Sequence, residues 1–351
     1  MSGQYALLRP PETAAEEWMM QLLSGFMVSQ CVHVAAQLGL AELLSNGPRS
    51  TDELAAACGA DPQALARLLR MLASVGVFAE VNDGRFATTP LAAVLRADHP
   101  SSLRAIAIFY GQEWIWRAYG ALRHSVTTGR PAFEHVFGQG FYGYLADSPD
   151  AARIFGDAMG AFAAMHSRTL VRAYDFGRFR RVADVGGNQG AFLVELLRAC
   201  PEARGVLFDA AHVVEAAVAR LARVEPEVRD RIELAAGDFL HEVPSGCDAY
   251  VLRNVLQDWD DERACAILTR CRDAMSDRAS LLVIGRELEP GNERHPGKLT
   301  DITMMVLTGG RERTSQETCA LLARAGFVVA SITRTESMVA IVEATVNGAR
   351  R

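Results

Sequence analysis

The chain has 351 residues, of which 50% are hydrophobic and 22% charged, and this composition excludes a disordered protein. The formal net charge of -6 argues against nucleic acid as the main partner, so small molecules are the expected ligands. No apolar run reaches about 18 residues, the length of a membrane span. Glu12, Glu16 and Glu17 stand where a signal peptide would be basic. We therefore expect a cytoplasmic protein with no membrane partner.

The cysteine and histidine patterns predict neither disulfides nor a metal site. The seven cysteines are odd in number, widely spaced and free of any C-x-x-C pair, which predicts buried, reduced thiols. Cys265 and Cys271 stand six apart without a histidine partner, and no H-x-x-x-H pattern occurs. We expect no bound metal.

Residues 1–100 are expected to form a helical domain. The segment 18–44 is apolar with helical spacing. Ser50 followed by Glu53 has the spacing of a capping box, and Asp61 before a proline predicts the start of another helix. Short helices divided by turns therefore open the chain.

A hairpin follows these helices, with strands at 77–81 and 85–88 around an Asn-Asp-Gly turn. Helices followed by a hairpin indicate a winged helix. A winged helix can bind DNA, but the candidate recognition helix offers only Arg67 and Arg70. The segment 18–44 is too apolar for a solvated surface, so dimerisation is the favoured role and a homodimer the expected assembly.

Residues 101–174 are expected to be a helical linker and substrate-pocket region. This segment is rich in aromatic residues between 109 and 144. Two interpretations remain open, because such rings either form ordinary core or line a pocket for a flat organic substrate.

Residues 175–346 alternate between short apolar strands and helices. The expected strands are 181–185, 205–208, 232–236, 249–252 and 281–284, closed by a terminal pair at 328–333 and 338–343. This alternation predicts an α/β fold of Rossmann-like type with a mainly parallel sheet. Ligands of such sheets bind beyond the carboxyl ends of the strands.

Three strand ends carry the pattern of an adenosine site. The loop 184–190, Asp-Val-Gly-Gly-Asn-Gln-Gly, follows the first strand, but its glycines do not have the G-x-G-x-x-G spacing of a dinucleotide site. Asp209 ends the second strand, where a carboxylate can accept ribose hydroxyls. Asp238 and Phe239 follow the third strand, where they can bind adenine. Each acid has an alternative role as a helix cap.

With these motifs the chain resembles the class I S-adenosylmethionine methyltransferases, and within them the caffeic acid and hydroxyindole type of O-methyltransferase. The resemblance rests on 184–190, 237–239, 252–262 and 309–314, in that order. It implies S-adenosylmethionine as cofactor, S-adenosylhomocysteine as product, a homodimer, and a small aromatic substrate of secondary metabolism or antibiotic biosynthesis.

The resemblance also assigns a set of cofactor-binding residues. Gly186 and Gly187 would contact the methionine part, Asp209 the ribose, and Asp238 and Phe239 the adenine. Further positions at the edge of the same pocket are Arg253, Trp259 and, for the cofactor carboxylate, Arg153.

The catalytic segment departs from the family pattern. The usual Leu-His-Asp-Trp, with histidine as general base, is replaced by a sequence in which Gln257 takes the histidine position. A glutamine amide cannot take up a proton near neutral pH. Arg286 replaces the glutamate that steers the histidine, and strand alternation would aim Glu287 the other way. Glu312 remains, so Gln257 and Glu312 are the expected catalytic positions.

Two functions are compatible with the missing base. Methyl transfer to an oxygen, and less readily to carbon or nitrogen, can proceed by in-line positioning if the acceptor ionises easily, with Arg286 or Arg311 favouring the anion. Alternatively, the chain is a hydroxylase, decarboxylase or cyclase that retains the cofactor as a positive charge. A winged-helix regulator is a third, weaker interpretation. The expected acceptor-binding residues are Asn254, Met159, His166, Met304 and Arg311, with His166 also a substitute base.

Overall fold

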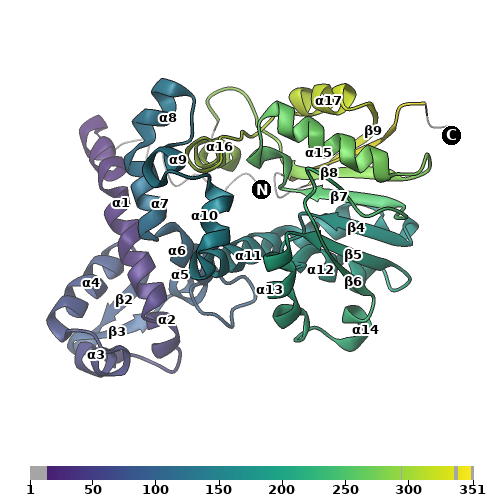
Figure 1. Ribbon diagram of the computed structural model, residues 1–351. Coiled ribbons are helices and arrows are strands. Elements are labelled where there is room, and N and C mark those ends of the chain that lie inside the picture. Colours follow the sequence, from purple (N-terminus) through teal and green to yellow (C-terminus); the bar gives the residue numbers. More distant parts are fainter. Residues whose placement is uncertain (1–13, 294, 336–338, 349–351) are drawn as a thin grey trace. The chain divides into compact units, whose positions relative to one another are not determined.

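The computed structural model describes residues 14–293, 295–335 and 339–348, which include part of the acidic segment at the amino terminus. The chain divides into two compact units, Met1–Trp116 and Arg117–Arg351, and the boundary falls inside α7 (Glu113–Gly120). Figure 1 shows helices and a small sheet in the first unit and a large sheet covered by helices in the second.

The first unit has the order of elements expected of a winged helix. Its helices are α1 (Ala15–Gln37), α2 (Leu40–Leu43), α3 (Thr51–Cys58), α4 (Pro62–Ser74), α5 (Pro90–Ala93) and α6 (Arg104–Tyr110). Its strands are β1 (Arg49–Ser50), β2 (Phe78–Val81) and β3 (Arg85–Thr88), in the sheet order β1-β3-β2. The hairpin is confirmed, whereas β1 was not expected, since two residues leave no alternation to detect.

The predicted helix starts are confirmed by their caps. Glu53 N–H donates to Ser50 Oγ at 3.3 Å, and Ser50 N–H donates to a Glu53 carboxylate oxygen at 2.7 Å. Ala64 N–H donates to Asp61 Oδ1 at 2.8 Å. The first helix is shorter than the apolar segment 18–44, because Gly39 adopts a φ of 65° between α1 and α2.

One face of α1 exposes large apolar side chains. Met20, Leu23 and Phe26 are 62%, 60% and 51% exposed. By length and composition α1 could also cross a membrane, which the expectation from the sequence had excluded. An apolar surface of this kind is typical of a protein interface.

The second unit contains a sheet of seven strands. They are β4 (Arg181–Val185), β5 (Arg204–Asp209), β6 (Ile232–Ala236), β7 (Ala249–Arg253), β8 (Ser280–Arg286), β9 (Phe327–Arg334) and β10 (Val339–Val346), in the order β6-β5-β4-β7-β8-β10-β9. The expected strands are confirmed, and β10 runs antiparallel to the other six strands. The expected start of the last strand at Met338 lies outside the described residues.

Helices cover both faces of this sheet (Figure 1). One face packs against α11 (Pro149–Ala173), α12 (Ala191–Ala199) and α13 (Ala211–Leu221), and the other against α15 (Asp261–Ala274) and α17 (Ser315–Arg324). The remaining helices are α8 (Leu122–Thr128), α9 (Ala132–Phe137), α10 (Phe141–Asp147), α14 (Pro226–Arg229) and α16 (Pro296–Leu307), with 3-10 turns η2 (Asn82–Gly84), η3 (Phe176–Arg178) and η4 (Leu256–Asp258). The strand order reverses at β4, so the crevice for a ligand lies at the carboxyl ends of β4, β5 and β7.

All seven cysteines are free, as expected. The expectation that all are buried is wrong, because only Cys247 and Cys271 are buried and the other five are half-buried. Those five lie on helix flanks or at helix ends, where neighbours cover only part of the side chain.

Candidate active site

The loop after β4 requires glycine at two consecutive positions. Gly186 adopts a φ of 71°, and its N–H donates to Phe208 O at 2.8 Å. A Cβ at Gly186 would lie 2.7 Å from Val255 Cγ2, and a Cβ at Gly187 would lie 2.5 Å from Leu207 Cδ1. A side chain at either position would push the loop, which joins β4 to α12, away from Val255 or Leu207.

A buried carboxylate lies behind this loop. Asp184 is 1% exposed, and its Oδ2 has no hydrogen-bond partner in the described part of the chain. A Cβ at Gly187 would lie 2.7 Å from this carboxyl group. Burial raises the pKa of Asp184 to about 7, against the opposite effect of Arg253. A carboxylate without a bound partner favours a cationic ligand at the loop. S-adenosylmethionine would be such a ligand, because it carries sulfonium and ammonium groups.

Asp209 holds the loop in place from the end of β5. Its Oδ2 accepts the Asn188 N–H at 2.8 Å, and its Oδ1 accepts the Ala210 N–H at 2.8 Å. A carboxylate has about four acceptor positions, so two backbone bonds leave capacity for the hydroxyls of a ribose. The geometry is compatible with the expected role.

Asp238 is satisfied within its own turn. Its Oδ1 accepts the Leu240 N–H at 2.8 Å, and its Oδ2 lies 2.9 Å from His241 Nδ1. No helix begins between β6 and β7, so Asp238 stabilises a turn rather than capping a helix, and its contact with adenine stays a prediction.

An aromatic cluster borders the loop 254–259. The Trp259 ring stacks on Tyr142 at 5.7 Å and meets Phe239 edge-on at 5.9 Å. The Tyr142 hydroxyl donates to Asp258 Oδ2 at 2.5 Å. Burial raises the pKa of Asp258 to about 7. Phe239 and Trp259, both expected at the adenine, are thus brought together, and Tyr142 joins them from α10.

The aromatic segment before β4 divides between core and site. Phe133 and Phe141 are 0% and 3% exposed and pack edge to face at 5.2 Å, as core residues do. Tyr142, next in the chain, is 37% exposed and turned to Trp259. Core packing is therefore confirmed for Phe133 and Phe141, and a role of the other rings in lining a substrate pocket stays a prediction.

The two arginines expected at the cofactor differ in environment. The Arg253 guanidinium is buried and donates to Ser167 Oγ at 2.9 Å and Ala163 O at 2.8 Å, which ties β7 to α11. Burial lowers its pKa to about 10. Arg153 is exposed and forms ion pairs within α11 to Asp150 and Asp157 at 3.9 and 3.7 Å. Its contact with a cofactor carboxylate stays a prediction.

Arg313 and Gly310, which the sequence did not single out, contact the turn η4. Arg313 is buried and donates to Leu256 O at 2.7 Å and Trp259 O at 3.0 Å, while Asp261 neutralises its charge at 2.7 Å. A Cβ at Gly310 would lie 2.0 Å from the main-chain oxygen of Gln257. The resemblance covers 309–314 as a block, but their contacts with η4 span more than 50 residues of chain and leave no local signal.

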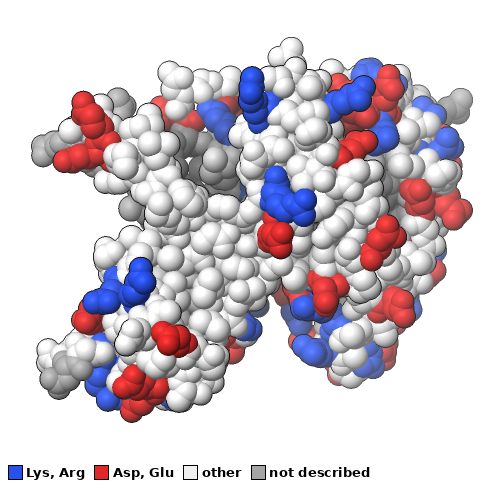
Figure 2. Space-filling view, turned by 60° about the vertical axis from the view of Figure 1, so that its left-hand side comes forward, with Lys and Arg blue, Asp and Glu red and all other residues white. Residues whose placement is uncertain are grey.

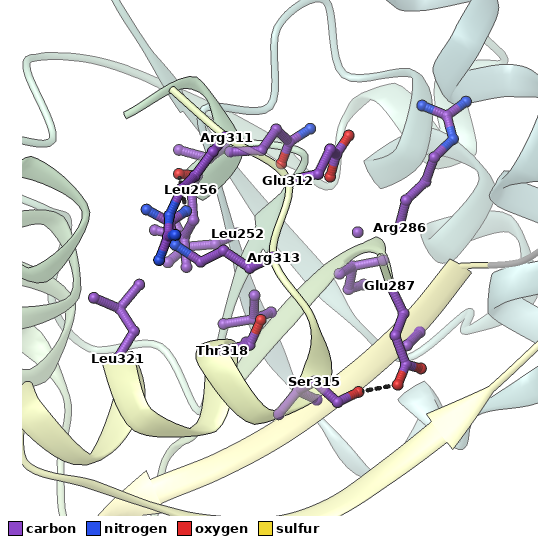
Figure 3. A pocket seen from close by; sticks show the side chains of 17 residues that line it. Leu252, Leu256, Arg286, Glu287, Arg311, Glu312, Arg313, Ser315, Thr318 and Leu321 are labelled. Atoms are coloured by element: carbon purple, nitrogen blue, oxygen red, sulfur yellow. Dashed lines mark hydrogen bonds between the residues drawn. The ribbon is translucent and has the colours of Figure 1, made fainter. Parts of the chain in front are cut away.

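Arg286 and Glu287 point to opposite sides of β8, as the alternation predicted (Figure 3). Glu287 hydrogen-bonds to Ser315 and pairs with Arg334 at 2.8 Å through both oxygens. Glu312 lies on the side of Arg286, and both residues line a cavity at the end of β8 together with Gln257, Arg311 and Arg313. Glu312 is 4% exposed, and its Oε1 has no partner among the described residues.

Asn254 directly follows β7, and Gln257 is the middle residue of η4. Asn254 adopts a φ of 52°, which asparagine tolerates better than most residues. A Cβ at Gly285 would lie 3.8 Å from Asn254 Oδ1 and 3.9 Å from Gln257 Oε1. Both amides therefore lie beside the end of β8, where the family's base and its steering residue would meet.

Three other residues expected at the acceptor lie on the helices α11 and α16. His166 on α11 is half-buried, and burial, followed by the charges of Arg286 and Arg253, lowers its pKa. Met159 and Met304 are half-buried on α11 and α16. The contact of these three residues with an acceptor stays a prediction.

Arg311 also lines the cavity at the end of β8, and its guanidinium pairs with acidic side chains at the starts of α15 and α17. Its partners are Asp261 and Glu317, at 3.2 Å in each case. The charge of Arg311 is therefore already compensated within the protein, unlike that of Arg286.

The carboxyl groups of Glu287 and Glu312 are expected to change the stability of the folded state in opposite directions as pH rises. Burial raises the pKa of Glu312 to about 7, so the folded state loses stability as pH rises from about 4.5 to 7. Glu312→Gln should raise the free energy of unfolding by roughly 2 kcal/mol at pH 8 and change it little at pH 4. Chemical denaturation at both pH values measures this.

The control is Glu287→Gln. Arg334 lowers the pKa of Glu287, so this carboxylate stabilises the folded state above its unfolded pKa, and the stability is lost as pH falls through the folded pKa. Glu287→Gln should therefore destabilise the protein at pH 8. Equal effects of the two substitutions at pH 8 would contradict the assignment.

Charged side chains are mixed in sign on the face shown in Figure 2. Basic and acidic groups alternate there, separated by broad uncharged areas, without a continuous basic surface among the atoms described. Among the described residues, no group of three or more His, Cys, Asp or Glu is arranged to hold a metal.

Comparisons with known proteins give the family of the chain. The O-methyltransferase domain family matches residues 119–328, and the O-methyltransferase dimerisation domain family matches residues 20–98. The second match includes most of α1, so its exposed apolar face belongs to a dimerisation domain and supports a homodimer.

Individual relatives cover nearly the whole chain. The phenazine O-methyltransferase PhzM of Lysobacter antibioticus is 44% identical over 93% of this chain and 95% of its own length. The crystal structure of LaPhzM has a TM-score of 0.92 at 42% identity, covering 95% of this chain and 100% of that one. NcsB1 from neocarzinostatin biosynthesis, solved with S-adenosylmethionine and 2-hydroxy-5-methyl naphthoic acid, has a TM-score of 0.77 at 32% identity, covering 91% and 96%. The chain belongs to the S-adenosylmethionine-dependent O-methyltransferase family.

Proposed function

We propose that this enzyme transfers a methyl group from S-adenosylmethionine to a hydroxyl of a small aromatic secondary metabolite. The observation that carries the proposal is the glycine loop over the unpaired carboxylate of Asp184, beside the end of β5. The names of the relatives support the acceptor class, since one methylates a phenazine and another was solved with a hydroxynaphthoic acid. A homodimer in the cytoplasm is the form in which we expect it to act.

The residues of the crevice fit the parts of the cofactor. Gly186 and Gly187 would hold the methionine part above Asp184, Asp209 the ribose, and Phe239 and Trp259 the adenine. When bound, S-adenosylmethionine supplies a methyl group on a sulfonium, an electrophile that reacts with an oxygen anion without further activation.

The residues around the acceptor hold it in place and align it, but they do not deprotonate it. Asn254, directly after β7, and Gln257, within η4, offer amide groups that can hydrogen-bond to an acceptor oxygen. Holding that oxygen in line with the methyl group supplies several kcal/mol of the barrier reduction. The proton of the hydroxyl leaves to solvent or to His166, because Gln257 cannot take it up. Acidic phenols are therefore the preferred acceptors.

The function is tested by following S-adenosylhomocysteine and product mass together with a panel of acidic phenols and hydroxyphenazines. Methylated product in equal amount to S-adenosylhomocysteine is expected. Product formed without S-adenosylhomocysteine would show that the chain is a non-methylating enzyme that retains the cofactor. A salt-dependent shift of mixed DNA without cofactor binding would favour the winged-helix regulator.

A further inference from the structure

We infer that Arg286 forms a subsite for a carboxylate, and that the acceptor is an aromatic hydroxy acid bound through that group. This inference rests on the proposed function and narrows its substrate class.

The first argument is that the charge of Arg286 is not compensated within the described part of the chain. Its Nη1 donates to Thr300 Oγ1 at 3.2 Å, and no described carboxylate oxygen lies within 4.0 Å of the guanidinium. A guanidinium has five N–H donors, so most of its capacity is unused. Half-buried cations are normally paired, and a bidentate carboxylate is the partner that matches this geometry best.

The second argument is the contrast with the other arginines of the same cavity. Arg311 pairs with Asp261 and Glu317, and Arg313 pairs with Asp261 and two carbonyl oxygens. Both therefore serve the structure of η4 and α17. Arg286 alone among these three remains available to a ligand.

The third argument is the position of Arg286. It ends β8, next to Gly285, which is flanked by the amides of Asn254 and Gln257. Figure 3 shows its side chain extending away from Glu287, on the side of Glu312. An aromatic ring can therefore place a carboxylate at Arg286 while a hydroxyl on the same ring faces the amides. A bound carboxylate would also offset the free-energy cost of burying the Arg286 cation, at a position where the family usually has a carboxylate.

The alternative partner of Arg286 is Glu312. The charge of Arg286 lowers the pKa of Glu312, but burial has the larger effect and the pKa stays near 7. Arg286 therefore offsets the charge of Glu312 only in part, and the two side chains lie too far apart to form an ion pair. This alternative predicts that the role of Arg286 is confined to Glu312 and is independent of the acceptor.

Calorimetry distinguishes a carboxylate subsite at Arg286 from a role of Arg286 that is confined to Glu312. The full-length enzyme is first titrated with S-adenosylhomocysteine, and the loaded enzyme is then titrated with 2-hydroxy-1-naphthoic acid, phenazine-1-carboxylic acid and their methyl esters. We expect at least one acid to bind about 10-fold more tightly than its ester. Arg286→Met should abolish this preference, Arg286→Lys should keep part of it, and Arg270→Met, which removes an exposed arginine of α15, should keep all of it.

Each other outcome has a definite meaning. Failure of S-adenosylhomocysteine to bind would overturn the proposed function itself. With S-adenosylhomocysteine bound, the carboxylate subsite is overturned if acids and esters bind equally or if no acid of the panel binds. It is also overturned if the preference survives in Arg286→Met and only the pH dependence of stability changes, because Glu312 is then the partner.

Discussion

Gly310→Ala should lower kcat/KM by about 100-fold, because a displacement of roughly 1 Å at a reacting group has an effect of this size. The added Cβ would lie 2.0 Å from Gln257 O and 2.4 Å from Asp258 C, both main-chain atoms that cannot rotate away. The turn η4 must therefore move, and Gln257 moves with it. Overpacking of this kind also costs about 1–3 kcal/mol of stability.

The measurement is S-adenosylhomocysteine release with an acceptor from the panel, together with thermal unfolding. Gly120→Ala is the matched control, since no atom lies within 4 Å of the Cβ it would add. That control should retain full activity and the stability of the wild type. Full activity in Gly310→Ala would remove η4 from the set of elements that position the acceptor.

Asp209→Asn should weaken binding of S-adenosylhomocysteine by about 5- to 150-fold, or about 1–3 kcal/mol, the cost of losing charge-assisted hydrogen bonds. Asp209 is expected to accept the ribose hydroxyls while it holds the Asn188 and Ala210 N–H groups at 2.8 Å. Asparagine preserves the shape but has one acceptor oxygen instead of two, so both roles are weakened. Titration calorimetry measures the change.

Asp248→Asn controls for the loss of backbone hydrogen bonds. Asp248 also accepts two backbone N–H groups, from Arg180 at 2.7 Å and Arg181 at 2.9 Å, but at the opposite ends of β4 and β7. It should lower stability without changing the affinity for S-adenosylhomocysteine. Equal loss of affinity in both variants would mean that Asp209 acts only through the fold.

Elements with local signals could be predicted from the order of residues alone. The strands of the large sheet, the capping box at Ser50 and the cap at Asp61 were all predicted, since each depends on residues within a few positions of one another. The opposite directions of Arg286 and Glu287 were predicted for the same reason, because strand alternation has a period of two.

Which charged groups remain available to a ligand depends on contacts between distant parts of the chain. Arg286 and Arg311 were equal candidates in the sequence, but Arg311 finds Asp261 and Glu317, whereas Arg286 finds no described carboxylate within 4.0 Å. The contacts of Arg313 with η4 likewise join residues more than 50 positions apart. Pairings at such separations depend on how helices and strands pack, and a periodic pattern in the chain does not record them.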